Sequence, residues 1–178
     1  MPRRFNALAA TLFAASVLTG CGTMGAGTGV TANLAPTGAI SPNPTMGKVN
    51  FKALEHGVRV EGEVRGMAPG TEHGFHIHEK GDCGDNGNAS GGHFNPAGGT
   101  HGKFAAPGSH AGELPSLVAD SSGVARFSVD VHTLSLTEGA SNNVIGRALV
   151  VHRDRDDFTT QPAGNSGPRI ACGVITRG

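Results

Sequence analysis

The sequence contains no tryptophan and no tyrosine, and aromatic residues make up only 4% of its 178 residues. A hydrophobic core must therefore be built from Val, Ile, Leu, Ala and Phe. No apolar run reaches the roughly 20 residues that a helix needs to cross a bilayer. Basic and acidic residues are equal at 14 each, so there is no net positive charge. This balance argues against a nucleic-acid-binding protein.

The N-terminus has the features of a secretory signal peptide. Arg3 and Arg4 precede an uncharged apolar run that ends in Leu-Thr-Gly-Cys at residues 18–21. A basic start, a short apolar segment and small residues at the cleavage point are typical of export signals. The ending also resembles the lipobox of bacterial lipoproteins, in which Cys21 would become the first mature residue and carry lipid. The alternative is a plain signal peptide with a chance cysteine.

Composition divides the chain further. Residues 21–45 are uncharged and consist largely of Gly, Thr, Ala, Pro, Ser and Asn. Such a segment buries little apolar surface, so we expect a flexible tether. The expected organisation is a lipoprotein signal peptide over residues 1–20, a tether over 21–45 and one folded domain over 46–178. Lipidated Cys21 would then anchor an exported protein to a membrane, in the periplasm or elsewhere in the cell envelope.

Only two cysteines, Cys83 and Cys172, remain once Cys21 is set aside. An exported protein meets an oxidising compartment, where two cysteines can form a bridge. Such a bridge would close a loop of about 90 residues and stabilise the fold by roughly 4–5 kcal/mol in the chain-entropy model. The alternative is a pair of thiolate metal ligands, although neither cysteine lies in a Cys-x-x-Cys pair.

The domain has the pattern of antiparallel strands. Apolar and polar residues alternate over 57–65 and 125–131, whereas 148–152 and 170–175 are more continuously apolar. Period-two alternation bounded by Gly, Asn, Asp and Pro predicts half-buried strands. No segment shows a helical stripe. Two stretches, one between Glu79 and Leu117 and one over 154–168, lack strand character. We expect two long loops that carry the chemistry of an all-β scaffold.

Histidines are concentrated in the first of these loops and in the strand before it. His76 and His78 are separated by one residue, so in a strand they project to the same side and can hold one metal ion. The loop adds His93, His101 and His110, and then Glu113. Three imidazoles and one carboxylate suit Zn²⁺. The alternative, that these are exposed polar histidines, is less favoured because five of them lie between residues 76 and 110.

Three motifs carry a resemblance to a known family. His-Gly-Phe-His-Ile-His-Glu at 73–79, followed by Gly-Asp-Cys at 81–83, resembles the copper-ligand strand and disulfide cysteine of copper/zinc superoxide dismutases. His-Phe-Asn-Pro at 93–96 resembles the segment of the bridging histidine. Gly-Pro-Arg-Ile-Ala-Cys-Gly-Val-Ile at 167–175 resembles the C-terminal signature. The motifs occur in the family's order. The fold implied is an eight-stranded antiparallel Greek-key β-barrel, or flattened sandwich.

The resemblance implies a copper site and a zinc site that share one imidazole. The copper ligands would be His76, His78, His93 and His152. The zinc ligands would be His93, His101, His110 and Glu113. The implied reaction is the dismutation of superoxide to dioxygen and hydrogen peroxide, with His93 supplying a proton.

Other residues receive supporting roles from the same resemblance. His73 would be structural, and Asp156 would be a carboxylate that links a copper histidine to a zinc histidine. Arg169 would attract the superoxide anion, held beside copper by a Cys83–Cys172 bridge.

The sequence departs from the family pattern at two points. Glu113 stands where the family usually has aspartate, so a longer side chain must be accommodated at the zinc site. The loop from Asp156 to Arg169 is short and lacks the lysine with which many members attract substrate, so Arg169 must supply more of the local positive field. A copper-only dismutase with a weakened zinc site, a non-catalytic copper-buffering lipoprotein and a plain β-sandwich binding module remain as alternatives. The resemblance leaves monomer and homodimer open.

Overall fold

The fold is seen in a computed structural model that describes residues 1–2, 29–38 and 43–178. Seven strands form one antiparallel sheet in the order β5-β8-β9-β1-β2-β3-β7, and β4 pairs with β6. One 3₁₀ segment, η1, spans Asp85–Ser90. The strands are β1 (Val30–Pro36), β2 (Met46–Ala53), β3 (Val58–Arg65), β4 (Glu72–His73), β5 (Phe75–His78), β6 (Leu117–Val118), β7 (Val124–Val131), β8 (Ala148–His152) and β9 (Arg169–Arg177).

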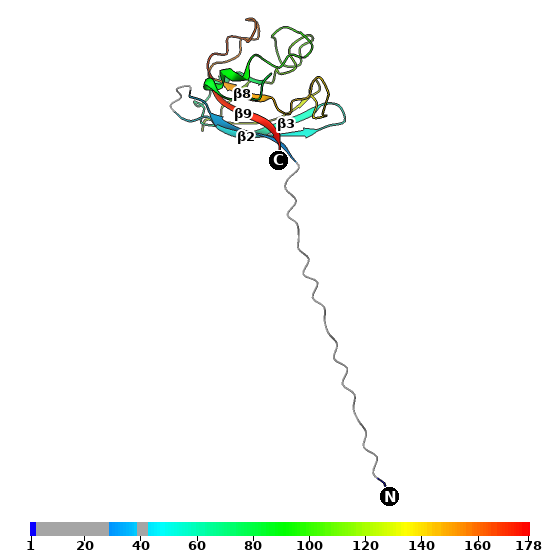
Figure 1. The fold of residues 1–178 in the computed structure, drawn as a ribbon. Helices are drawn as coiled ribbons and strands as arrows, with labels where there is room; N and C mark the ends of the chain where they lie inside the picture. Colours follow the sequence, from blue (N-terminus) through cyan, green and yellow to red (C-terminus); the bar gives the residue numbers. More distant parts are fainter. Residues whose placement is uncertain (3–28, 39–42) are drawn as a thin grey trace.

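The all-β prediction is confirmed, with an antiparallel sheet that curls into a half-barrel. Figure 1 shows β8 and β9 lying over β2 and β3, with the loops gathered on the β8 side. The described residues form nine strands where eight were expected, and two of the nine have only two residues each. No helix among the described residues is long and apolar enough to cross a membrane.

The structure places strand β1 inside the segment that was expected to be a tether. β1 pairs with β2 on one side and with β9 on the other, so the folded domain begins by residue 30 and not at residue 46. Val30, Ala32 and Leu34 are buried in the core, while Thr31 and Asn33 alternate with them. The alternation is present in the sequence, but no charged residue marks its outer face. The expected signal peptide, apart from residues 1–2, and Cys21 lie outside the described residues.

The predicted alternation positions the core. Val58, Val60 and Val64 of β3 are fully buried, and all five residues of β8 are buried as their continuous apolar run predicted. Gly62 interrupts the β3 valines because a Cβ there would overlap the Lys48 carbonyl oxygen of the neighbouring strand. β5 is buried on both faces, so its side chains are held between the core and the long loop.

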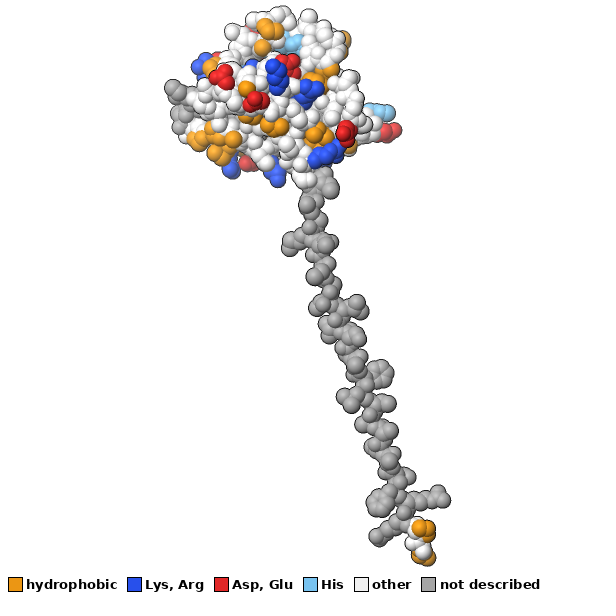
Figure 2. All heavy atoms as spheres, viewed as in Figure 1, with side chains coloured by type: hydrophobic (Ala, Val, Ile, Leu, Met, Phe, Trp, Pro, Cys, Tyr) orange, Lys and Arg blue, Asp and Glu red, His pale blue; other side chains and the backbone are white. Residues whose placement is uncertain are grey.

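The outer surface is mixed in charge. On the face in Figure 2, basic and acidic side chains are interspersed and apolar side chains are scattered between them. Several opposite charges pair directly on the outer face of the sheet, for example Arg59 with Asp130 at 2.7 Å. Exposed pairs of this kind contribute little stability.

Candidate metal centre

The copper-type histidines project from two adjacent strands. Phe75 and Ile77 of β5 enter the core, whereas His76 and His78 point the other way, as the alternation predicted. β5 pairs with β8. A register shift between Val151 and His152 occurs where β8 pairs with β9. His152, at the end of β8, has its ring centroid 5.0 Å from that of His76 and 5.5 Å from that of His78.

The first long loop folds back onto β5 and adds the remaining ligand-type side chains. Isolated bridges pair His78 with His93 and His76 with Glu113. The Phe94 amide donates to the Ile77 carbonyl at 2.8 Å. These backbone contacts stack the His93 ring on the His76 ring with centroids 4.0 Å apart. Residues distant in sequence therefore meet around β5.

Four imidazoles form one group. In three of them, one nitrogen is committed to an acceptor: His78 Nδ1 donates to the Gly91 carbonyl at 2.9 Å, His152 Nδ1 to the Gly167 carbonyl at 3.0 Å, and His76 Nε2 to Asp156 at 2.7 Å. His76 Nδ1 and His93 Nε2 are buried without a partner among the described residues. His78 Nε2 and His152 Nε2 lie 3.3 Å apart. One ring nitrogen of each residue is thus left facing a common point, with the four ligand atoms within 4.8 Å of one another.

A second group has three imidazoles and one carboxylate. Glu113 Oε1 lies 3.1 Å from His93 Nδ1, 2.9 Å from His101 Nδ1 and 2.8 Å from His110 Nδ1. One carboxylate oxygen contacts three ring nitrogens, more than a hydrogen-bonding role alone would explain. These nitrogen–oxygen distances approach the ligand–ligand spacing of about 3.3 Å that four ligands at roughly 2.0–2.1 Å from a tetrahedral ion would have. This set is typical of a closed zinc site.

His93 is a member of both groups. Its Nδ1 faces Glu113 in the second group, and its Nε2 is one of the unpartnered nitrogens of the first.

Asp156 connects the two groups from outside. One carboxylate oxygen accepts from His76 Nε2 at 2.7 Å, and the other accepts from His101 Nε2 at 2.8 Å. A side chain at Gly164 would collide with this carboxylate, so only glycine leaves room for it. The neighbouring Asp154 and Asp157 face elsewhere, toward Arg153 and toward the Thr159 and Thr160 amides. Asp156 is therefore the aspartate that meets both groups.

Burial favours the uncharged form of three histidines in the first group. Desolvation lowers the pKa of His76 and His78 well below the ordinary value, and the neighbouring histidines reinforce the effect. Desolvation likewise lowers the pKa of His152 to about 4. Burial works to raise the pKa of Glu113, but its contacts with His93 and the other histidines bring that pKa below its usual value. Neutral imidazoles and an ionised carboxylate are the forms that bind metals.

Arg169 is fixed by the loop that the disulfide closes. Cys83 and Cys172 are bonded, and Arg169 lies three residues before Cys172 at the start of β9. Its guanidinium donates to the carbonyls of Gly87 at 2.6 Å and Gly91 at 2.7 Å. These acceptors belong to η1 and the residue that follows it, so the bridge and the guanidinium hold the same loop. The pairing of the two cysteines is as predicted, and the thiolate-ligand alternative is wrong.

Other predicted residues fall beside the groups. His73 donates from Nδ1 to the His152 carbonyl at 2.8 Å and belongs to neither group, as expected of a structural residue. Sequence reasoning missed Gln161, whose amide accepts from the His101 backbone N–H at 2.8 Å and donates to the His101 carbonyl at 2.9 Å. No local pattern marks a glutamine that braces a loop 60 residues away.

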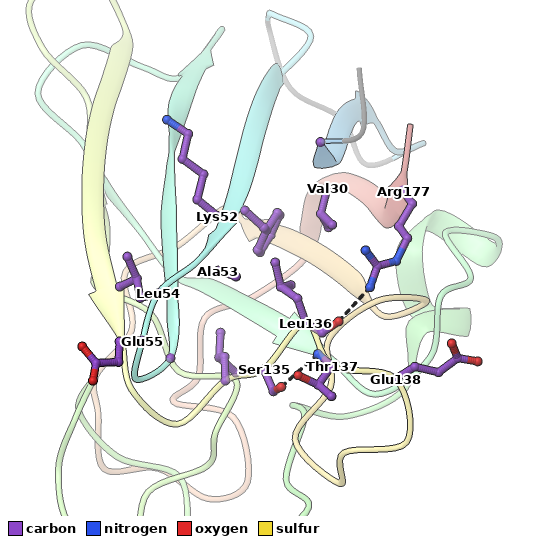
Figure 3. A pocket seen from close by; sticks show the side chains of 14 residues that line it. Val30, Lys52, Ala53, Leu54, Glu55, Ser135, Leu136, Thr137, Glu138 and Arg177 are labelled. Atoms are coloured by element: carbon purple, nitrogen blue, oxygen red, sulfur yellow. Dashed lines mark hydrogen bonds between the residues drawn. The ribbon is translucent and has the colours of Figure 1, made fainter. Parts of the chain in front are cut away.

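A separate hollow of about 760 Å³ opens at one end of the sheet, and no histidine lines it (Figure 3). It is bordered by Val30, Lys52 and the segment 134–138. Arg177 donates to the Leu136 carbonyl at 2.9 Å across it. It holds none of the residues of the two groups.

The residues fit two resident metal ions. Buried ring nitrogens without partners are costly unless something binds them. Four neutral imidazoles suit copper, and three imidazoles with a carboxylate suit zinc. The fold and the site together define an all-β metalloprotein with two adjacent metal sites.

Comparison with known proteins identifies the family. The model of the copper/zinc superoxide dismutase family matches residues 45–175. The chain is 40% identical over 134 residues to superoxide dismutase [Cu-Zn] 2 of Aquifex aeolicus, covering 73% of this chain and 78% of that protein. It is 39% identical over 141 residues to the extracellular superoxide dismutase [Cu-Zn] of Haemonchus contortus, covering 76% and 75%. A solved double mutant of a SOD-like protein from Bacillus subtilis superposes with a TM-score of 0.73 at 34% identity, covering 82% of this chain and 96% of that one.

The chain belongs to the copper/zinc superoxide dismutase family. It is an oxidoreductase that dismutes superoxide, and copper and zinc are its metals.

Proposed function

We propose that His76, His78, His93 and His152 bind copper, that His93, His101, His110 and Glu113 bind zinc, and that the His93 imidazole is common to both. The observation that carries this proposal is the division of the two His93 nitrogens. Nδ1 lies against Glu113 at 3.1 Å, while Nε2 is buried and has no partner among the described residues. A ring that served one metal would be expected to donate its second nitrogen to a carbonyl or carboxylate, as His78 and His152 do.

A bound copper ion supplies the alternating acceptance and donation of one electron, and zinc, which has no redox chemistry, holds the loop and polarises His93. The protein's own part is to place and charge its side chains. His93 Nε2 is the atom at which this chain can hold a proton and deliver it to reduced superoxide. Asp156 keeps His76 and His101 in the tautomers that leave their Nδ1 atoms free.

Arg169 is the anion-guiding residue in this proposal. Its guanidinium is half-buried and permanently charged, and two backbone carbonyls fix its orientation. The Gly91 carbonyl joins it to the His78 ring, so the charge lies next to the copper group. A small anion is drawn to such a fixed cation and to its forked N–H donors.

We further propose that the enzyme protects the cell envelope, as an exported lipoprotein anchored through Cys21. The disulfide supports an oxidising compartment. Relatives from Haemonchus contortus and Brugia pahangi are named extracellular superoxide dismutases. Mass spectrometry of the mature N-terminus tests this part: a lipid-modified Cys21 is expected, and an unmodified mature N-terminus contradicts it.

The metal assignment is tested by metal analysis and a superoxide-consumption assay on the purified protein and on His93→Ala. One equivalent each of copper and zinc with high activity is expected for the parent. His93→Ala should lose most activity and should retain less of both copper and zinc than the parent, because it removes a ligand from each site. His56→Ala is the matched control, because His56 is exposed and lies outside both groups. Copper without zinc would favour a copper-only enzyme, and metal binding without turnover would favour a copper buffer. Either result contradicts the two-metal proposal.

A further inference from the structure

Glu113 has a second oxygen that the zinc set does not use. Oε1 is the oxygen that meets the three Nδ1 atoms, whereas Oε2 is buried and has no hydrogen-bond partner among the described residues. A buried carboxylate oxygen without a hydrogen-bond partner destabilises the fold unless a nearby group interacts with it. The closest approach of this carboxylate to His76 is from Oε2 to Nε2, at 3.6 Å.

The backbone fixes this approach. Glu113 and His76 are paired directly in an isolated antiparallel bridge. The Ile77 amide donates to the Gly112 carbonyl at 2.9 Å, and the Gly112 amide donates to the Phe94 carbonyl at 2.9 Å. The residue that completes the zinc set is thus held against the strand that carries the copper histidines, independently of any metal.

Two carboxylates therefore face one ring nitrogen. Asp156 accepts the His76 Nε2–H at 2.7 Å, and Glu113 Oε2 stands 3.6 Å from the same nitrogen. All three residues offer ligand-type atoms within 4.8 Å of one another, and all three are buried. In such a water-poor environment a second negative charge polarises the N–H further. The opposite ring nitrogen, His76 Nδ1, becomes a stronger donor.

We propose that Glu113 is a positioning residue for the copper ligand His76 as well as a zinc ligand, with Oε1 serving the zinc set and Oε2 serving His76. This inference rests on the proposed metal assignment. It gives a physical reason for glutamate at this position. An aspartate is shorter by one C–C bond of about 1.5 Å, which withdraws both oxygens and sacrifices one of the two contacts. Glu113 is then a direct link between the two metal groups, beside the link through Asp156.

The test distinguishes the effect of Glu113 on copper from its role as a zinc ligand, because it is carried out without zinc. Metal-free protein receives half an equivalent of Cu²⁺ and no zinc, and Cu²⁺ affinity, the EPR spectrum and the Cu²⁺/Cu⁺ potential are measured. Glu113→Asp and the isosteric Glu113→Gln are expected to lower Cu²⁺ affinity about 10-fold, the usual effect of losing a carboxylate partner of a ligand histidine. Both should also change the EPR spectrum and shift the potential to more positive values, because less negative charge faces His76.

His110→Ala is the matched control, since it removes a zinc ligand and leaves Glu113 in place. It should keep parent-like copper affinity, EPR spectrum and potential. If both Glu113 variants match His110→Ala in all three copper readouts, Glu113 serves zinc alone and the inference is overturned. Failure of the underlying assignment is distinguishable, because the parent protein itself would then bind no copper through its histidines. Thermal unfolding of each metal-free variant verifies that it is folded.

Discussion

Arg169 and His78 are joined through a single carbonyl oxygen, that of Gly91, which accepts from the guanidinium at 2.7 Å and from the imidazole Nδ1 at 2.9 Å. Arg169, which we propose guides the anion, and His78, which we propose binds copper, therefore share one backbone support. The loop that provides it begins at the disulfide cysteine Cys83. The same loop thus connects the disulfide, the Arg169 guanidinium and the His78 ring.

Removing the charge of Arg169 should slow the reaction with superoxide. Arg169→Ala is expected to lower kcat/KM by about 10-fold and to weaken its dependence on ionic strength, because steering of an anion depends on the local positive field. Arg169→Lys should be intermediate, since it keeps the charge and loses the forked geometry. Pulse radiolysis at several salt concentrations measures both effects.

Arg177→Ala is the control for this prediction. It lies on the same strand, and its guanidinium reaches Leu136 at the hollow without histidines. It should leave the rate unchanged. Equal rates for Arg169→Ala and Arg177→Ala would contradict the guiding role.

Loss of the disulfide should destabilise the domain strongly. The bridge spans 89 residues in sequence. In the chain-entropy model its removal costs about 4–5 kcal/mol of unfolding free energy. Denaturant unfolding of Cys83→Ser/Cys172→Ser measures this loss. A thiol reductant should destabilise the parent toward the same value and leave the double variant unaffected; a parent insensitive to reductant would count against the prediction.

The metal-free protein should lose stability as the pH falls below 6.5. His152 has a pKa of about 4 in the folded state and an ordinary value of 6.5 when unfolded, so the unfolded chain binds more protons between these values. The loss from His152 is roughly 3 kcal/mol once the pH reaches 4. His76 and His78 act in the same direction. Asp156 and Glu113 raise the pKa of His101 against the effect of burial, so the contribution of His101 is constant below pH 6.5 and is lost as the pH rises above that value.

Urea unfolding of the apoprotein between pH 4 and pH 7.5 measures this dependence. The unfolding free energy should rise with pH up to about 6.5 and then decline as His101 loses its proton. If the unfolding free energy does not change with pH below 6.5, the buried histidines take up protons in the folded apoprotein as readily as in the unfolded chain, and the prediction is wrong.

Zinc should stabilise the apoprotein through the second group. At a free concentration 100 times the dissociation constant, a ligand specific for the folded state adds about 2.7 kcal/mol. Thermal unfolding with and without Zn²⁺ measures the shift, which His110→Ala should largely abolish. Mg²⁺ at the same concentration should have no effect, because it prefers oxygen ligands in octahedral geometry. An equal shift with His110→Ala would mean that zinc binds elsewhere.

Strand β1 should be required for folding. It lies in the interior of the seven-stranded sheet, paired with β2 and β9. A chain that begins at Gly29 should give a cooperative unfolding transition, whereas one that begins at Met46 should not, because β2 and β9 would lose their common neighbour. Circular dichroism during heating compares the two. If the chain that begins at Met46 folds and binds metal, β1 is not required and the domain boundary predicted at residue 46 is correct.

The sequence by itself determined the chemistry of this protein and most of its strands. His76 and His78 alternate with core residues, and that period of two is a local property of the chain. Continuous apolar residues likewise identified β8. The family resemblance predicted the histidines, Glu113 and Asp156, which the structure brings together. The motifs themselves marked the histidines, whereas Glu113 departs from the family pattern and Asp156 has two other aspartates close by.

Tertiary structure decided what depends on contacts between distant segments. β1 gains its two neighbouring strands only in the folded protein. Its own sequence alternates weakly and carries no charge, so composition alone predicted a tether. Only the bridge between Glu113 and His76 brings the second carboxylate oxygen near the His76 ring. Only the loop over residues 83–92 fixes the orientation of the Arg169 guanidinium. Local patterns record which face of a strand is buried, but they do not record which remote backbone atom will meet it.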